Sequence, residues 1–311
     1  MSRARTWPPI LRIAISAANA ADDGHLQSAL AELAVQSPTA IIDPQAHDGF
    51  YNIDGRTEPD LDSICDRIRD DYSIEIDVRP PEAILIEAIR KSAEGEGKYI
   101  RQTGGSGNYG HCNLRIEPAQ PGKGYEFVNE IRDGSVPNRF LNAIEQGIQG
   151  AMRLGILAGH PIENVKACLI GGSFHRTDSN ENAFRFAGSI AFRAAARRAL
   201  PVLLEPMMSL EFEMPDGIAR AVESEIHALR GRFERNESAK GFSEVKAIVP
   251  LAELLSSASG ALTGAPMEFF DYEPVRDDRP PESGLGVAAN KPRPPHFGLC
   301  SGINPLDSEK G

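Results

Sequence analysis

The residues best suited to chemistry lie in one glycine-rich stretch, Lys98 to Arg115, which holds three basic residues, two tyrosines and a histidine but no Asp or Glu. The whole chain has 33 Lys and Arg against 44 Asp and Glu, so this window reverses the local charge. Residues 105–110 fit GxGxxG, the pattern of dinucleotide-binding loops. Such a loop needs a helix after it, because the phosphates bind at the helix N-terminus. An alternating segment, 111–116, follows instead, so we predict a hairpin loop and no nucleotide site.

Other candidate catalytic residues do not combine into a site. His111 and Cys112 are neighbours on a predicted strand, so their side chains point to opposite faces and cannot act as base and nucleophile. His175 and Asp178 could bind a metal or relay a proton, but the sequence offers them no further ligand. GxxxxGK[ST], HExxH and GxSxG motifs do not occur. We therefore predict no catalytic residue, no metal and no cofactor, and a chain that is not an enzyme.

Tyr109 and Phe174 are aromatic residues placed in glycine-rich loops, where there is little core for them to join. Exposed rings of this kind stack on nucleic-acid bases. A small local core beneath each loop is the competing interpretation. Composition leaves both alternatives open.

The composition, with 41% hydrophobic and 25% charged residues, is typical of a soluble globular chain. No stretch approaches the ~18 to 20 apolar residues of a membrane helix, and the apolar N-terminal patch, broken by Arg12, predicts a strand and not a signal peptide. Four widely spaced cysteines favour a reducing, cytoplasmic location. The net charge of −11 argues against nonspecific coating of nucleic acid but permits a focused basic surface. Nothing indicates an oligomeric state.

Hydrophobic periodicity predicts the elements that position the loops. Residues 8–80 predict a strand at 10–15, a helix capped by Asp22 or Asp23, strands at 39–43 and 50–54, a helix begun by Pro59, and a strand at 74–78. Residues 201–272 predict the same order: a strand to about 213, a helix through 218–229, strands at 232–236 and 242–249, a short helix after Pro250, and a strand at 267–272. Both are the βαββαβ order of ferredoxin-like domains.

The segment between these two predicts a strand at 122–132, a helix after Pro137, a strand at 165–170, a polar loop at 171–180 and a helix at 179–199. In the last helix Phe186, Ile190 and Ala194 are spaced for one face, which we expect to be buried. We interpret the arginines of the other side as a solvated face. They are Arg185, Arg193, Arg197 and Arg198. Residues 273–311, rich in proline and glycine, predict a disordered tail.

The sequence RQTGGSGNYGH at 101–111 resembles the domain IV loop of bacterial elongation factor G, RQxGGRGQYGH. The likeness continues in the family's order at GSFH (172–175), Asp178-Ser179, SIAF (189–192), PVLLEPMM (201–208) and MEF (267–269). The resemblance implies an α+β fold of two ferredoxin-like βαββαβ domains flanking a ribosomal protein S5 domain 2-like domain. These would be domain III at 8–80, domain IV at 81–200 and domain V at 201–272, followed by the tail.

The resemblance also implies a partner, because in the family two tip loops of domain IV enter the A site of the small ribosomal subunit beside rRNA, mRNA and tRNA. The implied contact residues of the first loop are Gly104, Gly105, Ser106, Gly107, Asn108, Tyr109, Gly110 and His111. Those of the second loop are Ser173, Phe174, His175, Arg176, Thr177 and Asp178.

The sequence departs from the family at several points. The GTPase domain and the β-barrel domain after it have no counterpart here, Ser106 stands where the family has Arg, and the domain III signature is largely lost at 54–61. We therefore predict a cytoplasmic, ribosome-associated chain that contacts RNA and has no GTPase of its own. Two alternatives stay open. The chain could be part of a split or truncated factor that acts with a separate GTPase chain, or a scaffold reused to bind proteins.

Overall fold

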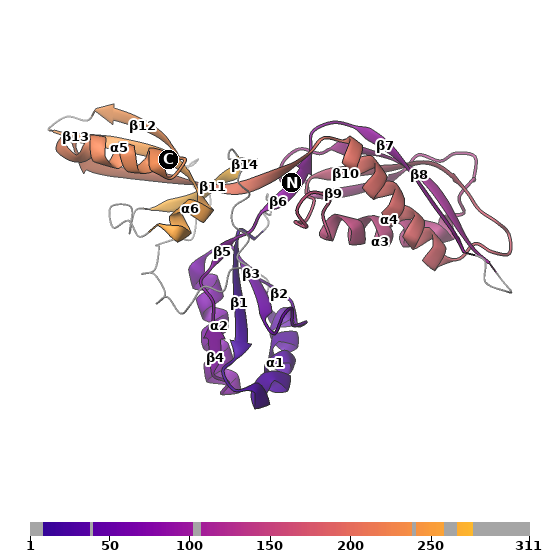
Figure 1. The fold of residues 1–311 in the computed structure, drawn as a ribbon, viewed down its shortest axis with the longest axis horizontal. Coiled ribbons are helices and arrows are strands. Elements are labelled where there is room, and N and C mark those ends of the chain that lie inside the picture. Colours follow the sequence, from indigo (N-terminus) through magenta and orange to yellow (C-terminus); the bar gives the residue numbers. More distant parts are fainter. Residues whose placement is uncertain (1–8, 38–39, 102–106, 238–240, 258–265, 276–311) are drawn as a thin grey trace, which may run out of the picture. The chain divides into compact units, whose positions relative to one another are not determined.

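The computed structural model describes residues 9–37, 40–101, 107–237, 241–257 and 266–275, and its fold mixes helices with three sheets (Figure 1). The chain divides into two compact units. Unit 1 contains the described residues of 85–204, and unit 2 contains those of 9–84 and 205–275. In the described part of the chain, no helix has the length and apolar character needed to cross a membrane.

Unit 2 contains two sheets with the same strand order. The first part is β1 (Leu11–Ala17), α1 (Asp23–Gln36), β2 (Ile41–Ile42), β3 (Tyr51–Gly55), α2 (Glu58–Tyr72) and β4 (Ile76–Val78), in the order β2-β3-β1-β4, with β5 (Glu82–Ala83) also on β1. The second is β11 (Pro201–Pro215), α5 (Ala219–Ala228), β12 (Arg232–Glu237), β13 (Phe242–Pro250), α6 (Leu251–Ser256) and β14 (Met267–Pro274), in the order β12-β13-β11-β14. The predicted βαββαβ element order is confirmed in both parts.

The two helices in the first part of unit 2 start in different ways. Thr57 caps α2 by accepting a hydrogen bond from the N–H of Asp60, and Pro59 lies in the first turn, as predicted. The predicted aspartate cap of α1 is wrong, because Asp22 makes no capping hydrogen bond. Asn19 accepts from the N–H of Ala21 and starts a 3-10 turn, Ala20–Asp22, that leads into α1.

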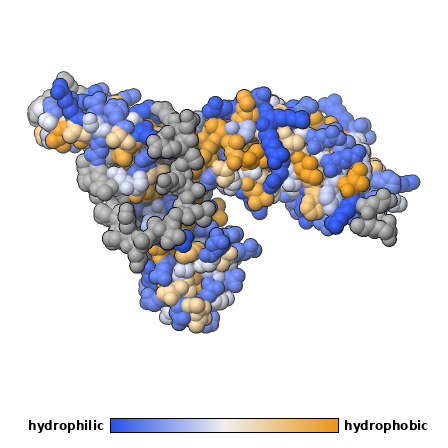
Figure 2. Space-filling view, in the orientation of Figure 1, coloured by the Kyte–Doolittle hydropathy of each residue, from blue (hydrophilic) through white to orange (hydrophobic). Residues whose placement is uncertain are grey.

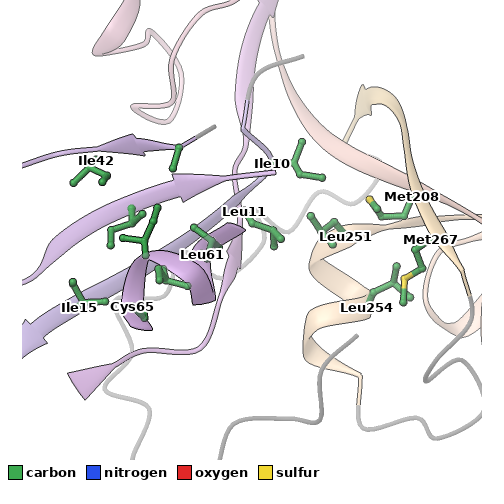
Figure 3. Packing of buried hydrophobic residues seen from close by; sticks show 14 of the residues in the cluster. Ile10, Leu11, Ile15, Ile42, Leu61, Cys65, Met208, Leu251, Leu254 and Met267 are labelled. Carbon is green, nitrogen blue, oxygen red and sulfur yellow. The ribbon is translucent and has the colours of Figure 1, made fainter. Parts of the chain in front are cut away.

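Nearly all buried apolar residues described in unit 2 form one cluster, to which both sheets contribute. Figure 3 shows Leu11 of β1 and Leu251 of α6 among its members. At its edge, the hydroxyl of Tyr272 lies 3.3 Å from the carbonyl oxygen of Pro9 and 3.4 Å from that of Ile84, and its single proton can be donated to either. The two parts of unit 2 therefore share a single core.

Unit 1 is built on a four-stranded sheet in the order β7-β8-β10-β9, with one face covered by two helices (Figure 1). The strands are β7 (Ala93–Arg101), β8 (Asn108–Pro118), β9 (Tyr125–Asn129) and β10 (Val165–Ser173), and the helices are α3 (Leu141–Arg153) and α4 (Glu181–Arg198). Within this sheet β9 and β10 pair in parallel, and the β7–β8 and β8–β10 pairs are antiparallel. A further strand, β6 (Ile86–Ile89), pairs with residues 201–204 of β11. The expected strand at 122–132 is shorter, because Gly122 and Gly124 adopt positive φ before it.

Helix α4 packs very closely on β7 and β8. A Cβ on Gly97 would lie 1.9 Å from the carbonyl oxygen of Ala187, and one on Gly110 would lie 2.4 Å from that of Ala183. Only glycine at these strand positions, opposite alanine on the helix, allows the two backbones to approach so closely. This contact fixes the position of α4 beside the β7–β8 hairpin.

The close packing also shows that the prediction for the buried face of α4 is wrong. Phe186 is 52% exposed and Ile190 is 42% exposed. The buried face consists instead of Ala183, Phe184, Ala187, Gly188, Ala191, Phe192, Ala195 and Ala196. The reason is steric, because α4 lies so close to the glycine-bearing strands that mostly small side chains fit between them. Hydrophobic periodicity instead predicts that the largest apolar residues are buried.

Candidate nucleic-acid interface

Two loops far apart in sequence are joined at one end of the unit 1 sheet. The main-chain N–H of Tyr109 donates to the carbonyl oxygen of Asp178 at 2.8 Å. The N–H of Gly107 donates to Oδ1 of Asp178 at 3.3 Å, and Tyr109 forms an isolated parallel bridge with Ser179. Residues 107–111 and 173–180, which we call the tip, therefore form one structure.

A chain of polar side chains crosses three strands on the sheet face opposite the helices. Nε2 of His111 lies 3.0 Å from Oε1 of Glu96, and Nδ1 lies 2.8 Å from Oγ of Ser173. That Oγ lies 2.8 Å from Oη of Tyr109. An ionised carboxylate only accepts, so Nε2 of a neutral His111 carries the proton. Ser173 then donates to Nδ1 and accepts from Tyr109, which gives every member a partner.

The second loop exposes its side chains while fixing its backbone. The N–H of His175 donates to Oγ of Ser179 at 2.8 Å, and Nδ1 of His175 lies 3.0 Å from Oδ2 of Asp178 and 3.1 Å from Oγ1 of Thr177. The His175 side chain is 58% exposed. Arg176 is also exposed, and Phe174 is 40% exposed. The loop thus exposes the Phe174 ring, the Arg176 guanidinium and the His175 imidazole on a backbone that hydrogen bonds hold in place.

Asn180 links the tip to α4. Its Oδ1 accepts from the N–H of Ala183 at 2.9 Å, which caps the helix, and its Nδ2 donates to Oδ1 of Asn108 at 2.6 Å. Glu96, Ser179 and Asn180 are site residues that the sequence analysis did not include. Asn180 carried a signal, because Asn before a helix is a preferred cap. The role of Glu96 depends on strand register, which the sequence did not specify.

The structure places the predicted residues of the first loop in different roles. Gly104, Gly105 and Ser106 lie outside the described residues. Gly110 is buried against α4, so its glycine character serves packing. The Tyr109 ring is partly buried and lies 6.4 Å from the ring of His175. Of the two open interpretations of the aromatic residues, Tyr109 fits a local cluster and Phe174 fits an exposed ring.

The thiol beside His111 is unsuited to nucleophilic chemistry. Cys112 is completely buried beneath the helices, whereas His111 lies on the opposite face, as strand geometry predicts. Burial raises the pKa of the Cys112 thiol to about 12, so it is protonated at neutral pH. Among the described residues, no group of three or more His, Cys, Asp and Glu side chains could hold a metal ion.

Residues 81–200 match the family model described as elongation factor G, domain IV. This part of the chain is therefore similar to domain IV of elongation factor G. The match contains both tip loops and the helix that Asn180 caps. It includes the motifs at 101–111, 172–175 and 189–192 on which the sequence resemblance depends, whereas those at 201–208 and 267–269 lie outside it.

A crystal structure of a protein from Thermus thermophilus is similar over 89% of this chain, with a TM-score of 0.62 and 36% sequence identity. The chain covers 42% of that protein, so it spans less than half of its length. Together with the domain IV match, this likeness supports the resemblance to the C-terminal half of elongation factor G.

Proposed function

We propose that this chain is a translation-factor-like protein that contacts RNA on the ribosome through the tip of unit 1. The observation that carries the proposal is the joining of the two loops, since the N–H of Tyr109 binds the carbonyl oxygen of Asp178. A joined tip presents Phe174, His175 and Arg176 on one support. These are a ring that can stack on a base, a donor, and a cation for phosphate. We propose that the tip points toward the A site of the small subunit.

We further propose that the remainder of the chain supports this tip. Residues 8–80 and 201–272 would be ferredoxin-like domains resembling domains III and V, and residues 81–200 an S5 domain 2-like domain. The shared strand order of the two sheets in unit 2 supports this assignment. Such domains would act in the cytoplasm as a scaffold and would perform no reaction.

Ribosome binding is tested by co-sedimentation of the full chain with purified small subunits at low and raised salt. Contacts to phosphate release counterions, so we expect binding that weakens steeply as salt increases. Pelleting with subunits at low salt and its loss at high salt would support the proposal. Absence of pelleting in both buffers would contradict it.

A second candidate is that the tip acts together with a GTPase supplied by another chain. It is favoured by the length of the Thermus thermophilus relative, of which this chain covers 42%. Neighbouring reading frames in the source genome would be searched for a GTPase domain, and its purified product mixed with this chain. A stable complex on size-exclusion chromatography would support this candidate, and two separate peaks would remove it.

A further inference from the structure

The outer face of α4 presents apolar and basic residues together. Phe186 and Ile190 are 52% and 42% exposed. Arg185 precedes them, and Arg193 and Arg197 follow at helical spacing on the same face, so the prediction that these two arginines lie on the opposite side is wrong. Hydrophobic and hydrophilic residues adjoin on the visible face of unit 1 in Figure 2. Isolated exposed apolar residues are ordinary, but residues one turn apart on one face form a surface. We call this surface, completed by Arg198, the α4 outer face.

An aromatic pair lies within this surface. The ring of Phe186 stacks on that of Tyr99 of β7, with centroids 4.8 Å apart and an interplanar angle of 24°. Tyr99 thus holds one side of the Phe186 ring, while about half of the Phe186 surface stays open. A ring fixed in this way stacks on a further flat group at little cost in side-chain entropy.

The arginines of the α4 outer face lack carboxylate partners. Within the described ranges, none of the four forms an ion pair: Arg185 donates to the amide oxygens of Asn182 and Gln146, and Arg198 donates to the main-chain carbonyl oxygen of Glu94. Seven other arginines, by contrast, each pair with a carboxylate: Arg12, Arg67, Arg69, Arg115, Arg230, Arg232 and Arg235. In a chain of net charge −11, these cations are available to an external anion.

This surface is continuous with the tip. Helix α4 begins directly after Asn180, whose side chain binds Asn108 of the first loop. Phe186 and Ile190 lie in the second and third turns from that end. An RNA strand that reaches the tip would therefore pass close to the α4 outer face.

We propose that the α4 outer face is a second RNA-contact surface, on which the arginines bind phosphates of an unpaired strand and Phe186 stacks on one of its bases. The inference rests on the proposed function and extends it from the loops to the helix. An acidic protein would also satisfy the cations. RNA is favoured because an open, preorganised aromatic ring interleaved with arginines is the surface that unpaired bases and phosphates recognise.

The test compares three variants of the full chain with matched controls. Arg193→Gln/Arg197→Gln removes two charges from α4, and Arg67→Gln/Arg69→Gln removes two from the surface of α2. Phe186→Ala removes the open ring, and Phe242→Ala removes a ring of similar exposure, 47%, from unit 2. Tyr109→Ala/His175→Ala alters the tip. Affinity for fluorescein-labelled oligoadenylate is measured by anisotropy over a salt series, affinity for purified small subunits by co-sedimentation, and folding by circular dichroism.

We expect Arg193→Gln/Arg197→Gln to weaken oligoadenylate binding about tenfold and to lower the salt slope by about 1.4, since each phosphate contact contributes about 0.7. Phe186→Ala should weaken it about fivefold or more, and the α2 and Phe242 controls should bind like wild type. Equal binding by folded α4 variants and wild type would overturn the inference. The inference would also be overturned if the α4 variants bound oligoadenylate like wild type and lost only a protein partner that wild type retains after RNase treatment.

The same experiment separates this inference from the proposed function. If small-subunit binding is lost in the tip variant but unchanged in the α4 variants, the proposed function is supported and the inference that the α4 outer face binds RNA is contradicted. If wild type binds oligoadenylate through α4 but does not pellet with subunits, the surface stands and the ribosomal role fails. If wild type binds neither, both fail.

Discussion

The main-chain N–H of Tyr109 donates a 2.8 Å hydrogen bond to the main-chain carbonyl oxygen of Asp178, and through it the β7–β8 hairpin and the β10–α4 loop hold each other. The side chain of Asp178 strengthens the link by accepting from the N–H of Gly107. Both hydrogen bonds connect the first loop to the second, so a substitution in one loop should alter the conformation of the other. Each half of the tip depends on its partner for its conformation.

Asp178→Ala should loosen the first loop although the substitution lies in the second. Loss of one hydrogen bond to a main-chain donor costs about 1 kcal/mol, which is about a fivefold increase in amide exchange at Gly107. Hydrogen exchange followed by NMR measures this directly. Asp133→Ala is the control, since Asp133 accepts from the nearby N–H of Ser135 in another loop of unit 1. Unchanged exchange at Gly107 in Asp178→Ala would show that the side-chain link is not formed in solution.

Gly97→Ala should destabilise unit 1 because the new Cβ would meet the carbonyl oxygen of Ala187 at 1.9 Å. Overpacking of this kind costs about 2 to 3 kcal/mol in the free energy of unfolding, measured by urea denaturation. Gly150→Ala on α3 is the control, since a Cβ there meets nothing within 4 Å. It should be neutral or stabilise the helix by up to about 1 kcal/mol. Similar values for the two variants would argue against the close α4–β7 contact.

Much of this fold could be predicted from periodicity, because both βαββαβ segments have capping or turn residues at their boundaries and alternating strands. The face of α4 could not, since the buried side is chosen by Gly97 and Gly110 on strands that only the folded sheet brings beneath the helix. Phe186 and Ile190 are more hydrophobic than the alanines that displace them from this contact.

The two loops of the candidate site could be predicted from the sequence, but the side-chain hydrogen bonds that connect them to the neighbouring strands could not. The resemblance to elongation factor G selected both loops, including Tyr109 and His111. It did not give the polar chain that joins them to Glu96 and Ser173, because that chain requires the register of three strands. A period of two residues tells which face a side chain takes, but not which residue it meets on the next strand.

Glu87→Gln should be strongly destabilising, because Glu87 is fully buried and its carboxylate accepts from four main-chain N–H groups. The donors belong to Ile156, Leu157, Ala158 and His160. An amide NH₂ would face these donors and lose charge-assisted hydrogen bonds, at a cost of about 2 to 3 kcal/mol. Thermal unfolding measures the loss. Exposed Glu94→Gln should stay within about 0.5 kcal/mol of wild type, and an equal effect of both would contradict the buried role of Glu87.

Cys112 should make unit 1 less stable in alkali. Burial raises the pKa of its thiol from the ordinary value of 9.0 to about 12. Between these values the unfolded chain releases the thiol proton while the folded chain keeps it, so stability falls as pH rises. The contribution is about 1.4 kcal/mol per pH unit. Comparing urea unfolding of wild type and Cys112→Ala from pH 8 to 11 isolates it, because Cys112→Ala should lack this part of the slope. Parallel curves would show that the thiol titrates normally.

The most direct test of the ribosomal role is co-sedimentation of the full chain with small ribosomal subunits, comparing wild type with Tyr109→Ala/His175→Ala. His25→Ala/His47→Ala is the control, since both histidines have exposed side chains on unit 2. With folding verified by circular dichroism, we predict that wild type and the control pellet with subunits at low salt and that the tip variant binds about tenfold more weakly or not at all. Tyr109→Ala removes the ring and hydroxyl that support Ser173 and His175, and His175→Ala removes an exposed polar contact. Equal pelleting by the tip variant and wild type would contradict the account.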